Sequence, residues 1–138
     1  MTCFDTTFLV ELLRGSQPAR IKYNELRQLR EKGELGKDDQ FCTTIINAYE
    51  LAKGAMLTRD PARNLKLVHE LLSELVILEL DLQSVDLSSE LYSKLSDTGK
   101  LIGEFDVLIA AICISNGQKL LTNDNDFGSI TQLARLGY

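Results

Sequence analysis

The sequence predicts an α/β protein in which helices cover both faces of a mostly parallel β-sheet. Short apolar, β-branched runs, such as FCTTII at residues 41–46, alternate with longer segments whose apolar residues recur at helical spacing. Strands that are separated by helices indicate βα units, and such units build parallel sheets with two covered faces. The 138 residues suffice for one domain, which we expect to span residues 1–138.

Glycine and proline mark the ends of several predicted helices. Gly15, Gly33 and Gly99 follow helical segments, whereas Pro18 begins one. Residues 33–40 form a loop by composition. The predicted strands lie at residues 2–5, 41–46, 75–80 and 119–122. The predicted helices lie at residues 6–15, 18–33, 47–57, 61–75 and 83–99 and from residue 105, followed by a short last helix near the C-terminus.

The composition is that of an ordinary globular protein. Hydrophobic residues make up 44% of the chain and charged residues 25%. No apolar run reaches the about 18 residues that cross a bilayer, and the N-terminal residues lack the basic start of a signal peptide. The three cysteines stand singly in apolar runs, which favours buried thiols in a reducing cytoplasm over disulfides or a zinc site. We therefore expect a cytoplasmic protein without a membrane segment.

The net charge of −5 is unevenly distributed along the chain. Residues 14–37 contain seven basic and three acidic residues, a local charge of +4, whereas the remainder has 8 basic and 17 acidic residues, or −9. One interpretation of the basic segment is a solvated helix with salt bridges. The other is a basic surface beside an acidic pocket, which could bind a phosphate backbone.

Five acidic residues lie where predicted strands end or helices begin. Asp5 closes the first strand, and Glu50 lies one helical turn after the second. Asp106 begins an apolar helix, Asp124 follows the last strand, and Asp126 comes two residues later. Ligands of open α/β sheets bind at the carboxyl ends of the strands, so these positions suit a site. Each residue alone also has a structural explanation, as a helix N-cap or as an exposed helical residue.

Carboxylates gathered at one edge of a sheet would repel one another. Two unit charges about 4 Å apart cost on the order of 4 kcal/mol at an effective dielectric constant of about 20. Such a cluster persists when its members are protonated, pair with cations or bind a metal. Oxygen ligands with no His or Cys nearby favour Mg²⁺ or Mn²⁺ over zinc, and a carboxylate-held ion of this kind typically serves phosphoryl chemistry.

Four stretches within residues 2–127 carry a recognisable pattern: FDTTFLVELLRG, TTIINAYELAKGA, GEFDVLIAAICISNG and KLLTNDNDF. In these stretches and in their order, the chain resembles the PIN-domain ribonucleases, most closely the VapC-type toxins of toxin–antitoxin pairs. The most specific feature is an Asp that begins an apolar-Ile-Ala-Ala helix, followed by a strand and Thr-x-Asp. The resemblance implies a three-layer α/β/α sandwich, which agrees with the βα pattern.

The resemblance also implies roles for individual residues. An acidic quartet would hold Mg²⁺ or Mn²⁺ and activate a water that cuts an RNA phosphodiester. The quartet consists of Asp5, Glu50, Asp106 and Asp124. Thr6 and Thr122 match hydroxyl positions that orient those carboxylates or the water, and Asp126 is either a cap or a supporting acid.

The sequence departs from the family pattern in two places. Thr7 stands where Asn is common, which alters a hydrogen bond. The chain ends at ARLGY, where relatives continue into a last short strand, so we expect that strand to be short or missing.

The resemblance implies partners as well. Toxins of this type form homodimers and are neutralised by an antitoxin chain, whose C-terminal segment lies across the acidic pocket and often presents a basic residue to it. For RNA, the basic segment is the candidate phosphate-binding surface, and its first candidates are Arg14, Arg20, Lys22 and Arg27.

Other functional classes fit the sequence less well. A phosphatase of the haloacid-dehalogenase type would need a second Asp at Thr7, and nucleotide-binding modules would need a P-loop or a GxGxxG stretch. His69, the single histidine, has no nucleophile pattern around it, so we interpret it as structural. Two alternatives stay open: a free-standing RNA-processing nuclease, and a PIN-fold binding protein without turnover. The intact quartet argues against the second.

Overall fold

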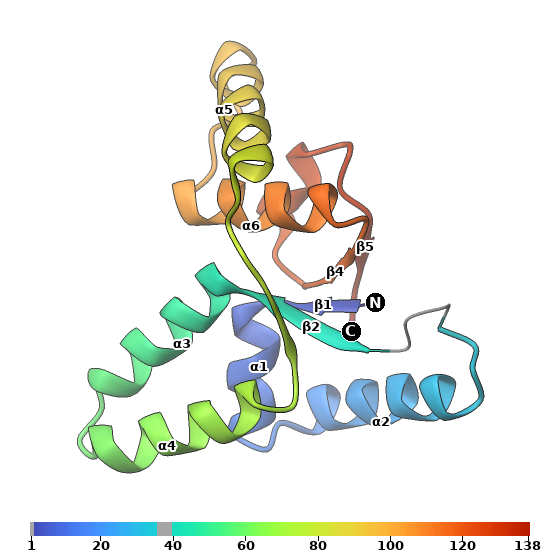
Figure 1. Ribbon diagram of the computed structural model, residues 1–138, viewed down its shortest axis with the longest axis vertical. Helices are drawn as coiled ribbons and strands as arrows, with labels where there is room; N and C mark the ends of the chain where they lie inside the picture. Colours follow the sequence, from blue (N-terminus) through green and yellow to red (C-terminus); the bar gives the residue numbers. More distant parts are fainter. Residues whose placement is uncertain (1, 36–39) are drawn as a thin grey trace.

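The computed structural model describes residues 2–35 and 40–138, in which short strands alternate with helices (Figure 1). The strands are β1 (Thr2–Phe4), β2 (Phe41–Thr44), β3 (Val76–Leu78), β4 (Lys119–Leu121) and β5 (Arg135–Leu136). The helices are α1 (Thr6–Leu13), α2 (Gln17–Glu31), α3 (Ile45–Met56), α4 (Pro61–Leu72), α5 (Leu82–Asp97), α6 (Glu104–Ser115) and the 3-10 helix η1 (Asn125–Ser129). Every strand and helix predicted up to residue 122 has a counterpart, and residues 36–39 of the predicted loop lie outside the described residues.

The strands form one parallel sheet in the order β3-β2-β1-β4-β5. In β1, Cys3 is level with Cys42 of β2 on one side and with Leu120 of β4 on the other. Because all pairings are parallel, the carboxyl ends of the strands lie along the same edge, with β1 in the middle. The predicted α/β class with a parallel sheet is confirmed.

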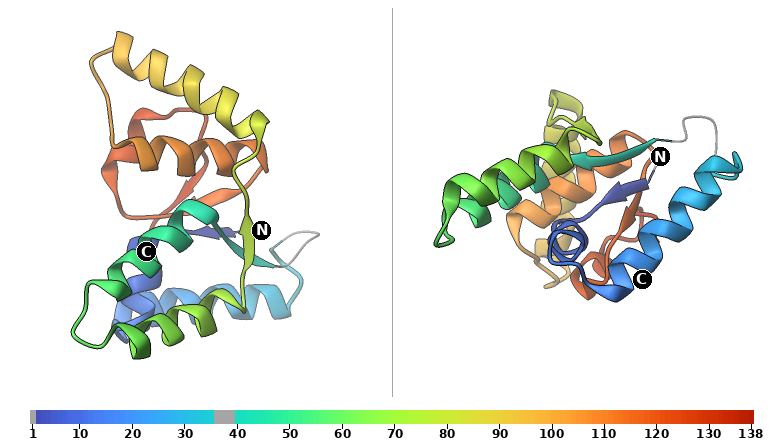
Figure 2. Two further views of the ribbon diagram at one scale, coloured as in Figure 1. Left: turned by 60° about the vertical axis from the view of Figure 1, so that its left-hand side comes forward. Right: turned by 90° about the horizontal axis from the view of Figure 1, so that it is seen from below.

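Successive side chains of the strands enter two cores on opposite faces of the sheet. Cys3 and Leu120 pack with residues of α5 and α6, whereas Phe4 and Leu121 pack with residues of α1, α2, α3 and α4. Figures 1 and 2 show the same separation, with α5 and α6 on one side of the sheet and α1 and α2 on the other. The three-layer α/β/α sandwich is therefore confirmed.

Two expectations from composition can be compared with the structure. Cys3, Cys42 and Cys113 are buried and free, as their apolar surroundings predicted. In the described part of the chain, none of the helices combines the length and the apolar character needed to cross a bilayer.

Helix α3 begins two residues earlier than predicted because Thr44 and Asn47 form a reciprocal N-cap. The backbone N–H of Asn47 donates to Thr44 Oγ1 at 3.1 Å, and the backbone N–H of Thr44 donates to Asn47 Oδ1 at 3.2 Å. These bonds satisfy main-chain groups that the first helical turn leaves unpaired. The cap therefore ends β2 at Thr44, although the β-branched Ile45 and Ile46 favour a longer strand.

The predicted last helix is wrong, because the chain after η1 forms β5 instead. The backbone N–H of Leu120 donates to the Ala134 carbonyl at 2.9 Å, and that of Thr122 donates to the Leu136 carbonyl at 2.9 Å. The open edge of β4 offers main-chain partners, which outweigh the weak helical pattern of this segment. The final strand, which the sequence left as short or missing, is thus present with two residues.

The buried position of α6 leads to a prediction of stability. Ile112 is fully buried, so Ile112→Ala should lower the free energy of unfolding by about 2–5 kcal/mol, because apolar packing is removed and a cavity forms. Leu57 is 81% exposed, and Leu57→Ala should change that free energy by no more than about 0.5 kcal/mol. Urea unfolding followed by circular dichroism measures both variants, and equal effects would contradict the place of α6 in the core.

Candidate metal centre

The acidic residues singled out in the sequence converge at the carboxyl edge of the sheet. Asp5 directly follows β1, and Asp124 lies three residues beyond β4, the neighbour of β1. Asp106 lies in the first turn of α6, and Glu50 lies in the second turn of α3, which follows β2 on the other side of β1. Parallel pairing therefore brings together residues that are up to 119 positions apart in the chain, Asp5 and Asp124.

Asp5 is only 5% exposed, and both of its carboxylate oxygens accept hydrogen bonds. Oδ1 accepts from the Thr6 backbone N–H at 2.9 Å and from Asn47 Nδ2 at 3.2 Å, while Oδ2 accepts from Thr122 Oγ1 at 2.7 Å. Burial raises the pKa of Asp5, and the bonds from Thr122 and Thr6 oppose that rise by stabilising the charged form. Asp5 is thus both the N-cap of α1 and the centre of a polar network.

Thr6 connects this network to Glu50. The Thr6 hydroxyl donates to Glu50 Oε1 at 2.8 Å and accepts from Asn47 Nδ2 at 2.9 Å. Because the amide nitrogen is a donor only, the hydroxyl proton of Thr6 is directed at Glu50. One oxygen of Glu50 is thereby engaged by the Thr6 hydroxyl.

Asn47 is the residue of this network that the sequence did not single out. It is fully buried, its amide nitrogen donates to Asp5 and Thr6, and its oxygen accepts from the N–H and the hydroxyl of Thr44. All of its hydrogen-bonding capacity is therefore used. The Thr-x-x-Asn spacing at residues 44–47 does indicate a helix cap. It gives no sign of the contact with Asp5, 42 residues away.

Asp106 does not cap the helix that it begins. The N-cap of α6 is Gly103, without a side-chain cap, and Asp106 lies within the first turn. Burial, followed by repulsion from the other carboxylates, raises the pKa of Asp106 to about 6. The repelling groups, strongest first, are Asp5, Asp124, Glu50 and Asp126. Asp106 therefore lies within electrostatic reach of all four of the other acidic residues.

Asp124 and Asp126 are ordered by the turn that follows β4. The Asp126 backbone N–H donates to Asp124 Oδ1 at 2.9 Å, so Asp124 caps η1. The Asp124 backbone N–H in turn donates to Thr122 Oγ1 at 3.1 Å, the hydroxyl that also holds Asp5. Thr122 thereby fixes the segment of Asp124 against the carboxylate of Asp5.

Three of the carboxylates are close enough to share a cation. Asp106, Asp124 and Asp126 each offer an oxygen that lies within 4.8 Å of the others, and the latter two are exposed. An all-oxygen set with negative charge suits Mg²⁺ or Mn²⁺. Asp126 thus lies among the possible ligands, whereas Asp5 and Glu50 border the group and are engaged by hydroxyl and amide donors.

The basic candidates lie on other elements. Arg14 is the C-cap of α1, and Arg20, Lys22 and Arg27 lie along α2. Lys22 Nζ is 3.4 Å from Glu25 Oε1, and the Arg27 guanidinium lies 5.9 Å from the centre of the Tyr23 ring. Part of this segment thus behaves as the solvated helix that charge patterning allowed. Lys37 lies outside the described residues.

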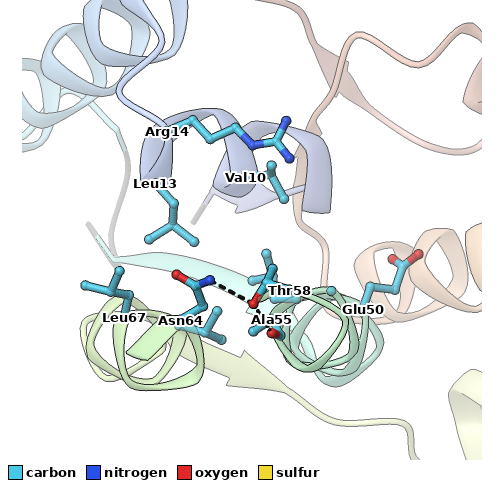
Figure 3. Close-up of a pocket in the computed structure, with 11 residues that line it drawn as sticks. Val10, Leu13, Arg14, Glu50, Ala55, Thr58, Asn64 and Leu67 are labelled. Atoms are coloured by element: carbon cyan, nitrogen blue, oxygen red, sulfur yellow. Dashed lines mark hydrogen bonds between the residues drawn. The ribbon is translucent and has the colours of Figure 1, made fainter. Parts of the chain in front are cut away.

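An apolar groove of about 260 Å³ extends from Glu50 between α1, α3 and α4 (Figure 3). Its apolar walls include Leu13, Leu67 and Val68. Figure 3 shows Glu50 at one end of the groove and Arg14 on the side formed by α1. The groove thus joins an apolar surface to the acidic site, with one charge of each sign beside it.

Comparison with known proteins identifies the family of this fold and site. The model of the PIN domain matches residues 2–133. The chain belongs to the PIN domain family. The similarity to PIN domains that the sequence motifs indicated is therefore confirmed over nearly the whole chain.

The relatives of this PIN domain include VapC proteins. Ribonuclease VapC2 of Haemophilus influenzae is 35% identical over 85 residues, which make up 62% of this chain and 64% of that protein. The match thus spans less than two thirds of that protein's length. The tRNA(fMet)-specific endonuclease VapC of Salmonella typhimurium is 30% identical over 101 residues, which make up 73% of this chain and 76% of that protein.

Solved structures share the fold at lower identity. VapBC2 from Rickettsia felis, bound to a DNA fragment of its promoter, has a TM-score of 0.86 at 23% identity, with 99% of this chain and 98% of that chain covered. DNA-bound VapBC from Salmonella typhimurium has a TM-score of 0.82 at 24% identity, with 99% and 98% covered. At these identities the likeness shows the common fold.

The crowding of carboxylates leads to a prediction for the metal-free protein. The pKa of Asp106 is raised to about 6, so between about pH 4 and pH 6 the folded state binds more protons than the unfolded state. The stability that a protonated Asp106 contributes is therefore lost as the pH rises through this range. Melting temperatures in EDTA from pH 4 to 7 measure the loss.

Two variants test whether Asp106 causes this loss of stability between pH 4 and pH 6. Asp106→Asn removes the titrating group, so its melting temperature should fall less between pH 4 and 6 than that of the wild type. Glu104→Gln removes an exposed carboxylate from the same helical turn and should keep the wild-type slope. Parallel curves for Asp106→Asn and the wild type would contradict the prediction.

Proposed function

We propose that this PIN domain is a metal-dependent endoribonuclease that hydrolyses RNA phosphodiester bonds and acts as the toxin of a toxin–antitoxin pair. The observation that carries the proposal is the carboxylate cluster at the sheet edge, in which Asp106, Asp124 and Asp126 lie within 4.8 Å of one another. The activities named for two relatives, ribonuclease and tRNA(fMet)-specific endonuclease, support the reaction class.

Asp106, Asp124 and Asp126 would hold Mg²⁺ or Mn²⁺, with Asp5 and Glu50 beside them. When bound, such an ion neutralises charge on the phosphate and makes a bound water more acidic. The other residues of the site act by positioning. The Thr122 hydroxyl holds the buried Asp5 and the chain at Asp124 in one arrangement. Fixed carboxylates of this kind need little reorganisation during the reaction.

Glu50 is the candidate general base. Its Oε1 accepts the Thr6 hydroxyl, and among the described residues no hydrogen-bond donor is found at its Oε2. Oε2 is therefore the atom that would take the proton of the attacking water. Thr6 and Asn47 act as positioning residues, because their hydrogen bonds fix the orientation of the Glu50 carboxylate relative to Asp5.

We further propose that the chain forms a homodimer and binds a cognate antitoxin. The VapBC structures that share its fold, and the structure of VapBC-5 from Mycobacterium tuberculosis, described as a member of a toxin–antitoxin family, support an antitoxin partner. The groove between α1, α3 and α4 offers an apolar surface to a segment of that partner. Glu50 at the end of the groove suits a basic side chain.

The nuclease proposal is tested with protein that is purified free of any partner and incubated with a mixed RNA pool in Mg²⁺ or Mn²⁺. EDTA should abolish cleavage, and Asp106→Asn should slow it at least about 100-fold, because a charged group of the site is removed. Glu104→Gln should cut at the wild-type rate. Absence of cleavage by folded, metal-loaded wild type would overturn the proposal in favour of a binding protein without turnover.

A growth assay separates the toxin from a free-standing processing nuclease. Expression of a toxin should arrest the growth of its host until the antitoxin is co-expressed, whereas a processing nuclease should permit growth.

The basic segment gives a separate prediction for RNA binding. Replacing Arg14, Arg20, Lys22 and Arg27 by Gln should weaken binding and reduce the salt dependence of the binding constant, with a slope change of about 0.7 for each phosphate that is no longer neutralised. Lys22 should contribute least, because it is paired with Glu25. Fluorescence anisotropy at several salt concentrations measures this slope. Lys94→Gln, on α5 in the opposite layer, is the control. Unchanged binding would make the segment a solvated face.

A further inference from the structure

Two exposed aromatic side chains meet between α3 and α6, the helices that carry Glu50 and Asp106. Tyr49 of α3 is 52% exposed and Phe105 of α6 is 40% exposed. Their ring centres are 5.7 Å apart and their planes are nearly perpendicular, at 88°. Lys53 Nζ lies 5.4 Å from the centre of the Tyr49 ring and 5.8 Å from that of Phe105. We call these three side chains the aromatic corner.

The aromatic corner lies on the same two helices as two of the residues proposed to act on RNA. Tyr49 immediately precedes Glu50 in α3, and Phe105 immediately precedes Asp106 in α6. The two helices contact each other, so the corner follows from the same packing that gathers the carboxylates. Neighbouring residues of a helix point roughly 100° apart, so the rings and the two carboxylates lie on adjoining faces of α3 and α6.

The chemistry of the corner differs from that of the groove between α1, α3 and α4. It combines two accessible aromatic rings with an exposed ammonium group, in a region where the other charges are negative. Any of the four nucleobases can stack on an aromatic side chain, so this contact does not depend on the RNA sequence. A lysine beside the rings attracts the phosphate of the same strand. One nucleotide can thus satisfy both kinds of surface.

We propose that the aromatic corner is a nucleotide subsite, in which a base of single-stranded RNA stacks on Tyr49 or Phe105 and Lys53 contacts an adjoining phosphate. This inference rests on the proposed ribonuclease function, and it adds which part of the substrate is bound, namely an unpaired base and the phosphate next to it. An unpaired base is required, because a base inside a duplex presents no free face to the rings. The subsite therefore selects loops and single strands at the point of cleavage.

A second copy of the chain fits the corner less well than a nucleotide does. The cores of protein interfaces are depleted in Lys, Glu and Asp, yet Lys53 lies against both rings, and the next residues in the chain are Glu50 and Asp106. A second copy of the chain that covered the rings would remove water from the Lys53 ammonium group. An RNA strand, in contrast, offers that group a phosphate. Charge complementarity therefore favours the nucleic acid.

Stacking is tested with single-stranded RNA oligonucleotides that carry one 2-aminopurine, whose fluorescence falls when it stacks. The probes are 2′-O-methylated, so that binding is measured without cleavage. With the wild type, one position of the 2-aminopurine should be strongly quenched. Tyr49→Leu and Phe105→Leu keep apolar side chains but remove the rings. Together they should abolish the quenching and weaken binding about 5-fold to 150-fold. Lys53→Gln should weaken binding and lower its salt dependence.

Tyr92→Leu is the matched control, because Tyr92 is an aromatic residue of α5 with a similar exposure of 42%. It should leave the quenching and the affinity unchanged. Circular dichroism and sedimentation of each variant accompany the binding measurements. If sedimentation shows that the leucine variants change the oligomeric state while RNA binding is unchanged, the corner is a contact between copies of the chain and the proposal is wrong.

Cleavage of unmodified RNA distinguishes failure of the subsite from failure of the proposed function. If the subsite is real, the leucine variants should raise KM for single-stranded RNA with a smaller effect on kcat. Wild-type cleavage with no change of KM or quenching in the variants would overturn the subsite and leave the nuclease intact. A wild type that neither binds nor cuts RNA would overturn both.

Discussion

The hydrogen bonding of one buried carboxylate holds the site together. Asp5 follows the central strand, is only 5% exposed, and would be costly to ionise without donors. Its three donors come from α1, α3 and the end of β4, namely Thr6, Asn47 and Thr122. Satisfying Asp5 therefore requires three segments of the chain to be in place together, and the same donors position the carboxylates around it.

The network also divides the acidic residues into two groups with different surroundings. Asp5 and Glu50 accept bonds from hydroxyl and amide groups, which hold their carboxylates in place. Asp106, Asp124 and Asp126 are more open and close to one another, so they remain available to a cation. Burial first, and then repulsion from the neighbouring carboxylates, raises the pKa of Asp106.

The sequence predicted most of the fold and much of the site, for reasons that can be named. Strand ends in a parallel sheet share an edge, so Asp5 and Asp124 could be placed together from local patterns alone. The part played by Asn47 could not be predicted, because it depends on a contact between α3 and the end of β1. Whether β5 is short or missing could not be decided from the sequence, because the edge of β4, and no local preference, decides its conformation. The position of Asp126 beside Asp106 and Asp124 depends on the turn that begins η1, and no periodicity in the sequence indicates this turn.

The bond between Asp5 and Thr122 has a consequence for the making of the protein. Its partners are 117 residues apart, so Asp5 is synthesised long before Thr122. At about 5–20 residues per second, this interval lasts roughly 6–23 s. During that time the chain lacks β4 and two of the carboxylates, Asp124 and Asp126. The cluster at the sheet edge is therefore incomplete until the last segments of the chain have been synthesised.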